Sequence, residues 1–300
     1  MNNPVVSVIM SVYNDKKYVS VAIDSILNQS FKDFEFIIIN DGSTDKTLEI
    51  LNDYERKDSR IVLINQENKG LTKSLNIGIK KAKGKYIARM DSDDISHPQR
   101  LQKQIEFLEN NQEYGLVGTN VEKIDEKGKH IEFNTTKYSN EEIQKTLYTR
   151  NCFAHGSVMI NKDLVSKDLY YDEEFKYAQD YRLWAKIAKK FKIANLREPL
   201  YKLRLHESSI SKEKIELQSI YAGIVSYEFE NNAKVDIFEL ETKTNKRLKE
   251  KIGKILLMNQ QPKLAKKYFN FFSLYYFLSI VFQYINIYKL RRFFKWKQPW

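Results

Sequence analysis

The first two hundred residues alternate between short apolar runs and longer segments whose apolar residues recur at helical spacing. The short runs are rich in β-branched residues, which is typical of strands buried on both faces. They predict strands at 5–12, 34–39, 61–64, 86–90, 115–121, 154–160 and 200–205. The helical spacing predicts helices at 19–27, around 48–51, and at 71–82, 101–108 and 179–188. Strands and helices in this alternation predict an α/β fold with a doubly wound, mainly parallel sheet flanked by helices.

The alternation does not continue to the end of the chain. Residues 122–137 are polar and contain glycine, which favours a hairpin or a mobile loop. From about Ser211 the pattern changes to long helices. We therefore expect an α/β domain over 1–210 and a helical C-terminal region over 211–300.

Polar side chains follow three of the predicted strands at the point where each strand ends. Tyr13 and Asn14 follow the first strand, Asp41 follows the second, and Asp91–Asp94 follow the strand at 86–90. Because parallel strands end at the same edge of a sheet, we expect these side chains to line one ligand-binding cleft.

The acidic segment carries three carboxylates, Asp91, Asp93 and Asp94, within four residues. Their charges repel, and Arg89 is the one neighbouring positive charge in the sequence. A divalent cation relieves the repulsion, because hard cations take oxygen ligands and bridge carboxylates to phosphate oxygens. The alternative is an acidic turn that caps the helix beginning near Pro98.

Two common nucleotide-binding motifs are missing from the sequence. There is no GxGxxG after the first strand and no GxxxxGK[ST] segment, which argues against a dinucleotide-binding Rossmann domain and a Walker-type hydrolase. A nucleotide can still bind if a metal ion at the acidic segment holds its diphosphate.

The net charge of +11 favours an anionic partner, either a nucleotide or a phospholipid. Nucleic acid is disfavoured, since the sequence has no helix-turn-helix, zinc-finger or RNA-binding signature. The single cysteine, Cys152, excludes an internal disulfide and fits a reducing compartment. The apolar run at 4–13 lacks the features of a secretory signal, so we expect a cytoplasmic protein.

The chain resembles a family 2 glycosyltransferase of the GT-A fold, of the bacterial surface-polysaccharide type. The resemblance covers about the first 210 residues and rests on seven segments in the order of the family. They are VSVIMSVYND (6–15), FEFIIINDGSTD (34–45), NKGLTKSLNIGI (68–79), GKYIARMDSDDISHPQRL (84–101), HGSVMI (155–160), QDYRLW (179–184) and LYKLRLHESSIS (200–211).

The resemblance implies a nucleoside-diphosphate sugar as donor, with UDP-sugar favoured. Ser11 and Tyr13 match the positions that line the base and the ribose, with the tyrosine ring stacked on uracil. Asp41 matches the carboxylate that accepts from the uracil N–H. Lys73 is expected to reach a phosphate or the base.

The resemblance also implies a Mg²⁺ or Mn²⁺ ion that bridges the diphosphate. Asp91 is expected at the donor, and Asp93 and Asp94 at the metal, although the sequence does not decide which of the three binds the ion directly. His206 matches a histidine that holds the metal or the diphosphate, and Arg204 is suited to neutralise the leaving phosphate. Without the resemblance, His206 reads as an ordinary loop histidine.

Asp180 matches the catalytic base of the family, which removes the proton from an acceptor hydroxyl as its oxygen attacks the anomeric carbon. A single displacement of this kind inverts the anomeric configuration. His155 and Trp184 are expected on the acceptor side. The structural alternatives are a helix cap for Asp180, a turn residue for His155 and a core position for Trp184.

The segment 268–288 has no charged residue and is long enough to span a bilayer as a helix. Basic residues flank it on both sides and aromatic residues dominate it, which favours a helix at the cytoplasmic leaflet over a single crossing. A membrane surface would suit a saccharide acceptor carried on a lipid. The alternative is a helix that packs on the catalytic domain or on a second subunit.

Two other functions remain open from the sequence. A sugar nucleotidyltransferase also uses an α/β domain and metal-binding carboxylates, but it usually has a glycine-rich loop after the first strand, and Ser11–Asp15 contains no glycine. A non-catalytic subunit of a membrane polysaccharide-assembly complex would not need the acidic segment, Asp180 and His206 together.

Overall fold

The computed structural model describes residues 3–206, 215–232 and 252–253. The chain divides into two compact units, Met1–Glu213 and Lys214–Trp300. The first unit is an α/β domain, and the second contributes the helix α9 (Ile215–Asn231). The aromatic segment 268–288 lies outside the described residues. None of the helices within the described ranges has the length and apolar character needed to cross a membrane.

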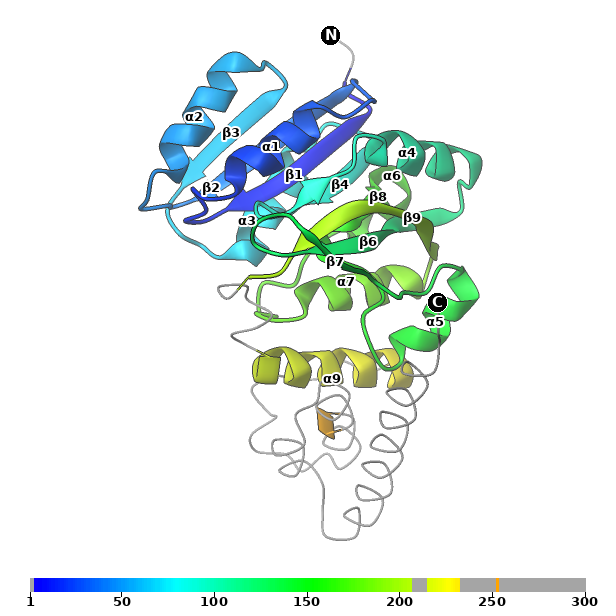
Figure 1. Cartoon of the computed structure of the whole chain (residues 1–300). Helices are drawn as coiled ribbons and strands as arrows, with labels where there is room; N and C mark the ends of the chain where they lie inside the picture. The colour runs from blue at the N-terminus through cyan, green and yellow to red at the C-terminus, as the bar shows by residue number, and fades with distance from the viewer. Residues whose placement is uncertain (1–2, 207–214, 233–251, 254–300) are drawn as a thin grey trace, which may run out of the picture. The chain divides into compact units, whose positions relative to one another are not determined.

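Four parallel strands form the first half of the α/β domain, in the spatial order β3-β2-β1-β4 (Figure 1). They are β1 (Val6–Val12), β2 (Phe34–Asp41), β3 (Ile61–Gln66) and β4 (Tyr86–Met90). The crossover helices between them are α1 (Val19–Leu27), α2 (Thr47–Lys57) and α3 (Leu71–Lys81). The predicted crossover units and parallel sheet are therefore confirmed.

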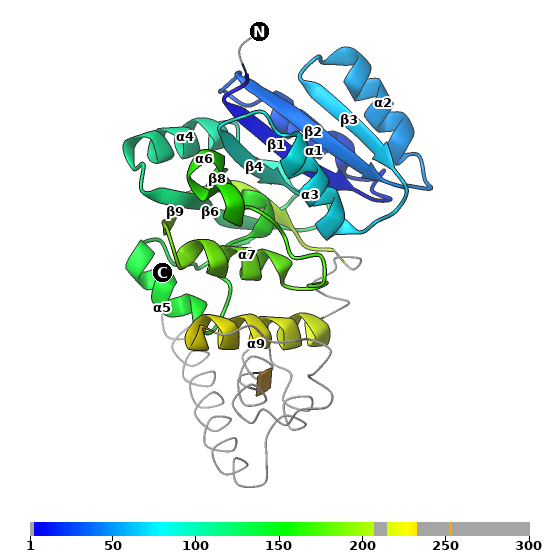
Figure 2. The ribbon, with the colours of Figure 1, turned by 180° about the vertical axis from the view of Figure 1, so that it is seen from behind.

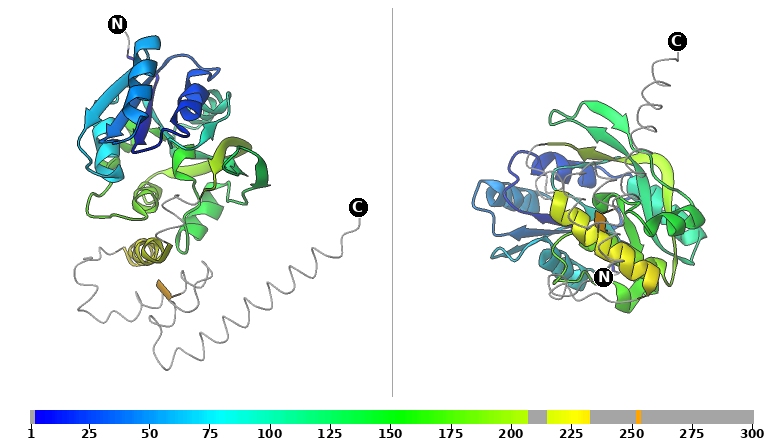
Figure 3. Two further views of the ribbon diagram at one scale, coloured as in Figure 1. Left: turned by 60° about the vertical axis from the view of Figure 1, so that its left-hand side comes forward. Right: turned by 90° about the horizontal axis from the view of Figure 1, so that it is seen from below.

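The second half extends the same sheet beyond β4 in the order β8-β6-β9-β5, with β7 paired to β6 at the margin (Figure 3). The strands are β5 (Ile95–Ser96), β6 (Tyr114–Ile124), β7 (His130–Phe133), β8 (Met159–Asn161) and β9 (Lys192–Arg204). The helices are α4 (Arg100–Asn110), α5 (Asn140–Leu147), α6 (Lys162–Val165) and α7 (Gln179–Ala188). Two single 3-10 turns are η1 (His155–Ser157) and η2 (Ser166–Asp168).

Helices cover both faces of this sheet. The apolar sides of α1, α2 and α4 pack with alternate residues of β1, β2 and β4 in one continuous core. On the other face, which Figure 2 turns toward the reader, α3 lies against Ile9 and Ile39, and α6 and α7 contribute Val165 and Ile187 around Gly115. Burial on both faces explains why these strands read as continuous apolar runs.

Two predicted strands have different bounds in the structure, and the structure also decides between a hairpin and a loop for residues 122–137. Of the predicted strand 154–160, only Met159 and Ile160 lie in a strand, β8 (Met159–Asn161), because the chain first makes the η1 turn around Gly156. The predicted strand 200–205 is the end of the longer β9, whose earlier part contains Pro199 at a register shift against β6. Proline cannot donate to the ladder, and this interruption conceals the strand in the sequence. Residues 122–137 contain the β6–β7 hairpin.

Candidate active site

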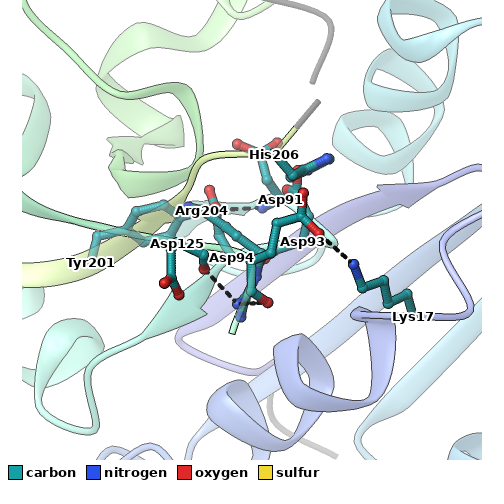
Figure 4. Close-up of polar contacts among 9 residues, drawn as sticks. Lys17, Asp91, Asp93, Asp94, Asp125, Tyr201, Arg204 and His206 are labelled. Atoms are coloured by element: carbon teal, nitrogen blue, oxygen red, sulfur yellow. Dashed lines mark hydrogen bonds and ion pairs between the residues drawn. The ribbon is translucent and has the colours of Figure 1, made fainter. Parts of the chain in front are cut away.

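The carboxyl ends of β1, β2 and β4 meet at one edge of the sheet. Met10 of β1 pairs with Ile38 of β2 on one side and with Met90 of β4 on the other, and all three strands are parallel. Asp41 and the acidic segment 91–94 therefore lie at the same edge, as the sequence predicted. Strand β9 brings Arg204 and His206 to the acidic segment from the opposite end of the chain (Figure 4).

Asp91 is held by a buried arginine and by the hydroxyl of Tyr201. Arg89 is 3% exposed, and its Nη2 donates to Asp91 Oδ1 at 2.6 Å while its Nη1 donates to the Ile9 carbonyl at 3.1 Å. The backbone N–H of Asp91 donates to the Tyr201 hydroxyl at 3.2 Å. These contacts fix the carboxylate at the end of β4, and Arg89 neutralises it as its place in the sequence indicated.

Asp93 and His206 form the pair that best matches a metal site. Asp93 Oδ2 and His206 Nε2 are hydrogen-bonded at 2.8 Å. Burial raises the pKa of the Asp93 carboxyl, the charge of Asp91 raises it further, and His206 opposes both effects. The histidine ring also packs on Tyr18, with ring centroids 5.4 Å apart. His206 lies just beyond β9, and its bond to Asp93 attaches it to the acidic segment.

Asp94 has a different partner from Asp93. It is 2% exposed, and its Oδ1 accepts the backbone N–H of Arg204 at 2.7 Å. Burial raises the pKa of this carboxyl well above its ordinary value, and the charges of Asp93 and Asp91 add to the effect. One oxygen of Asp94 thus joins the acidic segment to the end of β9.

The Arg204 side chain is also occupied by the protein. Its Nε donates to the Asp93 carbonyl at 2.7 Å, and its Nη1 donates to the carbonyls of Asp125 and Glu126 at 3.2 and 3.1 Å. The guanidinium lies over the ring of Tyr18, 4.6 Å from its centroid. The resemblance implied a phosphate contact for this residue, whereas these bonds attach it to three backbone carbonyls.

The residues at this edge fit a divalent cation in part. In the described residues, no three His, Cys, Asp or Glu side chains are already arranged around a common metal position. Asp93 and His206 nevertheless offer one carboxylate and one imidazole, both of which suit Mn²⁺, and Mg²⁺ commonly relies on one or two carboxylates plus substrate phosphates. The donor set present therefore fits a cation whose coordination is completed by a diphosphate and water.

Asp15 belongs to the same acidic group, although the sequence analysis did not single it out. Burial raises the pKa of its carboxyl to about 6; Asp93 adds to this, and Ser92 and His206 act in the opposite direction. Its backbone N–H donates to Thr47 Oγ1 at 2.9 Å. The available signal was its place two residues beyond Tyr13, in the loop after β1.

Asp41 organises the turn that begins α3. It is 2% exposed and accepts from Gln66 Nε2 at 2.7 Å and from the backbone N–H groups of Lys69 and Gly70 at 2.8 and 2.9 Å. A carboxylate has about four acceptor sites, so one remains for a further donor. Gly70 has a φ of 86°, a backbone conformation that glycine adopts without strain.

The other predicted donor residues lie around the same edge. Ser11 is a partly exposed residue of β1, next to its end. Tyr13 follows β1 and is 51% exposed, which leaves its ring open to stack on a ligand. Lys73 is exposed in the first turn of α3, the helix that begins beside Asp41.

Asp180 is the second residue of α7 and is half-buried. Ala178 occupies the cap position of this helix, with a φ of 52°, so Asp180 is not the cap residue. Its Oδ2 accepts from Asn151 Nδ2 at 2.8 Å. Burial raises the pKa of its carboxyl to about 6, and the charge of Asp91 contributes in the same direction. Trp184, one turn further along α7, packs on His155, whose neighbour Gly156 lies against Asp91, so α7 lies next to the acidic segment.

His155 and Trp184 are part of one aromatic cluster. His155 Nε2 is hydrogen-bonded to the Tyr171 hydroxyl at 2.8 Å, and the histidine ring packs on Trp184 with centroids 6.1 Å apart. Burial lowers the pKa of His155 to about 3, with Arg89 acting in the same direction, so the imidazole is neutral. Trp184 is fully buried, as expected for a core position.

Tyr171 and Asn151 are the candidate residues that the sequence reasoning missed. Tyr171 lies in a segment without regular secondary structure, and its backbone exchanges two hydrogen bonds with the Asn76 side chain, at 3.0 and 2.8 Å. Asn151 precedes the HGSVMI segment by several residues. Neither belongs to a motif with a recognisable spacing, and only the folded chain brings them to His155 and Asp180.

Gly156 joins the two halves of the site. A Cβ at this position would lie 2.7 Å from Asp91 Oδ2 and would overlap the Tyr201 hydroxyl. The absent side chain therefore allows η1, which carries His155, to approach Asp91. The segments predicted for the donor side and for the acceptor side are consequently in contact.

Comparison with known proteins gives the class of enzyme and the family. The family model described as "Glycosyl transferase family 2" matches residues 7–169, more than half of the chain. The chain belongs to the family 2 glycosyltransferases and is a glycosyltransferase enzyme. The readings as a sugar nucleotidyltransferase or a non-catalytic subunit are accordingly set aside.

Particular relatives support the same assignment. An uncharacterized glycosyltransferase of Methanocaldococcus jannaschii is 40% identical over 227 residues, which cover 74% of this chain and 78% of the relative. The O-antigen biosynthesis glycosyltransferase WbnJ of Escherichia coli is 40% identical over 215 residues, covering 70% of this chain and 83% of the relative.

Solved structures confirm the GT-A fold. The S. aureus protein TarS, in a complex with UDP, aligns over 88% of this chain and 87% of its own with a TM-score of 0.60 at 21% identity. The mannosyltransferase PcManGT of Pyrobaculum calidifontis, in complex with GDP-Man and Mn²⁺, aligns over 89% of this chain and 74% of its own with a TM-score of 0.60 at 14% identity.

Gly156→Ala tests whether η1 and Asp91 must touch. The added methyl group displaces Asp91 or Tyr201, and we expect sugar transfer to fall by about a hundredfold, the scale for misplacing reacting groups by an ångström. Activity of the purified variant and its circular dichroism spectrum are the measurements. A folded variant with unchanged transfer would show that the close approach has no functional role.

Proposed function

We propose that this enzyme transfers a sugar from a UDP-sugar to an acceptor hydroxyl, with inversion and with the aid of Mg²⁺ or Mn²⁺. The observation that carries the proposal is that η1 joins both sides of the site: Gly156 lies against Asp91, and His155 packs on Trp184 of α7, the helix that carries Asp180. Burial raises the pKa of the Asp180 carboxyl to about 6. A carboxyl with a pKa of about 6 is ionised at neutral pH and is still basic enough to accept a proton in the transition state.

At the donor side, Tyr13 stacks on the base and Asp41 accepts the uracil N–H. The exposed ring of Tyr13 and the remaining acceptor capacity of the Asp41 carboxylate support these roles. Ser11 faces the ribose together with Asp91, and Lys73 provides a positive charge at the start of α3. TarS, whose fold this chain shares, was also solved with UDP-GlcNAc.

At the diphosphate, Asp93 and His206 are the side chains that hold the cation. Asp94 helps to position these two residues, because its carboxylate accepts a hydrogen bond from the backbone N–H of Arg204. When bound, Mg²⁺ or Mn²⁺ neutralises the charge that develops on the leaving diphosphate. Asp91, fixed by Arg89, is left to contact the donor from the end of β4.

Asp180 acts as the general base. It takes the proton from the acceptor hydroxyl while that oxygen bonds to the anomeric carbon, and the bond from this carbon to the diphosphate oxygen breaks on the opposite face. Asn151 holds the carboxylate by its hydrogen bond to Oδ2. One displacement of this geometry inverts the anomeric configuration.

The acceptor is proposed to be a saccharide, free or carried on a lipid, in the assembly of a cell-surface polysaccharide. The neutral His155, whose Nε2 is hydrogen-bonded to the buried Tyr171 hydroxyl, offers an imidazole to sugar hydroxyls without a charge to desolvate. The O-antigen name of the relative WbnJ supports a surface saccharide. The proposed location is the cytoplasmic face of the membrane, on the strength of the aromatic and basic pattern of 268–297.

Asp180→Asn separates catalysis from folding. We expect transfer to fall by about a hundredfold or more, the scale for a lost general base, with UDP binding nearly unchanged. Because burial disfavours the charged carboxylate, the neutral side chain should also leave the free energy of unfolding at pH 7 unchanged or raise it, by at most about 3 kcal/mol.

Kinetics, UDP titration calorimetry and urea denaturation measure the three quantities. Asp163→Asn is the matched control, since Asp163 is exposed in the first turn of α6, and it should behave like the native enzyme. Equal losses of transfer, UDP affinity and stability in Asp180→Asn would make Asp180 a structural residue.

The pH dependence of kcat/KM should reveal the same carboxyl. Only the ionised base accepts a proton, so activity is full above the pKa of Asp180, about 6, and is lost as the pH falls through it. Asn151→Leu removes a hydrogen bond that favours the ionised form, and the acid limb should move to higher pH. An exposed control, Asn110→Ala, should leave the limb in place. An acid limb that Asn151→Leu does not move would argue against Asp180 as the titrating group.

Asp93→Ala tests the cation site. We expect UDP affinity in the presence of Mn²⁺ to fall, and the difference between affinities with Mn²⁺ and with chelator to shrink, because one of the two cation ligands is missing. Asp33→Ala, an exposed carboxylate just before β2 and far from its carboxyl end, is the control. An unchanged affinity with Mn²⁺ would remove Asp93 from the metal role.

A further inference from the structure

We propose that Arg204 is a positioning residue that fastens the β6–β7 turn, residues 125–129, to the acidic segment and thereby holds Asp93 and His206 in register for the diphosphate. The inference rests on the proposed function for its consequence at the donor. The fastening itself is a property of the described contacts and is tested separately below.

The side chain of Arg204 binds two segments that are far apart in the sequence. Nε donates to the Asp93 carbonyl at 2.7 Å, and Nη1 donates to both Asp125 and Glu126 carbonyls, at 3.2 and 3.1 Å (Figure 4). Backbone carbonyls cannot rotate away as side chains can. The bonds therefore fix the main chain of the acidic segment relative to the main chain of the turn.

The backbone of Arg204 makes the same connection a second time. Its N–H donates to Asp94 Oδ1 at 2.7 Å, and Arg204 lies opposite Ile124 at the end of the β6–β9 pairing. The next residue, Leu205, donates its N–H to the Ile124 carbonyl at 2.9 Å. His206 follows directly, so the bond between its Nε2 and Asp93 depends on where this end of β9 is held.

Hydrogen bonds within the turn 125–129 hold its own backbone in one conformation. Asp125 Oδ1 accepts the N–H groups of Lys127 and Lys129, each at 2.9 Å, and the Asp125 carbonyl accepts the N–H of Gly128 at 3.0 Å. Gly128 has a φ of 84°, which completes the tight turn. Because the turn has a fixed conformation, attaching it to the acidic segment restricts the movement of that segment, which a flexible loop would not do.

Tyr18 and Lys17 extend the cluster to the loop after β1. The Arg204 guanidinium and the His206 ring both pack on Tyr18, at centroid distances of 4.6 and 5.4 Å. Lys17 forms an ion pair with Glu126 at 2.8 Å, but both side chains are largely exposed, and such pairs contribute little. The buried guanidinium is therefore the main connection, and the exposed ion pair a secondary one.

Arginine suits this role and lysine does not. The guanidinium is a planar fork whose nitrogens donate in fixed, divergent directions, whereas an ammonium on a flexible stem is a single point charge. A residue that only neutralised phosphate could be either. Three backbone carbonyls at fixed positions require the fork, and this requirement distinguishes the positioning role from the phosphate contact that the resemblance implied.

Arg204→Lys tests the proposal in the full-length protein because it keeps the charge and removes the fork. We expect hydrogen–deuterium exchange of the backbone amides at 93–94 and 125–129 to rise about tenfold in the ligand-free protein. We also expect UDP affinity with Mn²⁺ to fall about tenfold, and the Mn²⁺ concentration for half-maximal activity to rise more than kcat falls.

Two further variants keep the test decisive. Asp125→Ala loosens the turn from within, so its effects on exchange and on UDP affinity should resemble those of Arg204→Lys even if that variant folds poorly. Lys17→Met removes the exposed ion pair with Glu126 and the contact of the Lys17 ammonium with the Tyr18 ring, and should change UDP affinity by less than about threefold.

The outcomes separate the alternatives. Weaker UDP binding with unchanged exchange in Arg204→Lys would make Arg204 a direct phosphate contact and overturn the proposal, and so would unchanged exchange together with unchanged affinity. If the native protein binds neither UDP nor Mn²⁺, the proposed function fails, while the exchange data still decide whether Arg204 fastens the turn.

Discussion

The structure depends on how it accommodates crowded negative charge at the carboxyl edge of a parallel sheet. Buried carboxylates are costly unless paired, and this edge gathers several from separate strands. Arg89 neutralises Asp91 directly. Arg100 is fully buried, donates to the carbonyls of Arg89 and Gly156 at 3.0 and 2.6 Å, and adds a second positive charge beneath the segment. Arg204 adds a third from β9.

Carboxyls with raised pKa values lie in the acidic segment and at the start of α7. Arginines from beneath fix the backbone and one face of the acidic segment, and the side chains of Asp93 and His206 remain together at the edge. Asp180 lies on α7. The hydrogen bond from Asn151 stabilises the ionised form of its carboxyl, and burial destabilises that form. The proposed base is thereby kept near its working pKa, beside the proposed site of the diphosphate. The neutral His155 completes the site without adding charge.

Much of the site was predictable because its residues follow strands. Asp41 ends β2 and Asp91 follows β4, and both strands are parallel to β1, which lies between them. Parallel strands share their carboxyl edge, so the convergence of the two residues followed from the alternation alone. The individual roles were less accessible. The sequence predicted Asp94 at the metal ion and Arg204 at the leaving phosphate. In the fold, the backbone N–H of Arg204 donates a hydrogen bond to Asp94 Oδ1. Tyr171 comes from an irregular segment, and no periodicity marks it.

The sequence by itself determined the α/β class, the parallel half of the sheet, the edge where the ligand site lies and the family, because hydrophobic periodicity and motif order are local properties of the chain. The tertiary structure alone decided which polar atoms face each other. Strand β9 brings Arg204 and His206 to Asp93 across 111 and 113 residues of chain, and the η1 turn brings Gly156 against Asp91. Such contacts depend on strand pairing at long range and on the close packing of turns, which no local pattern encodes.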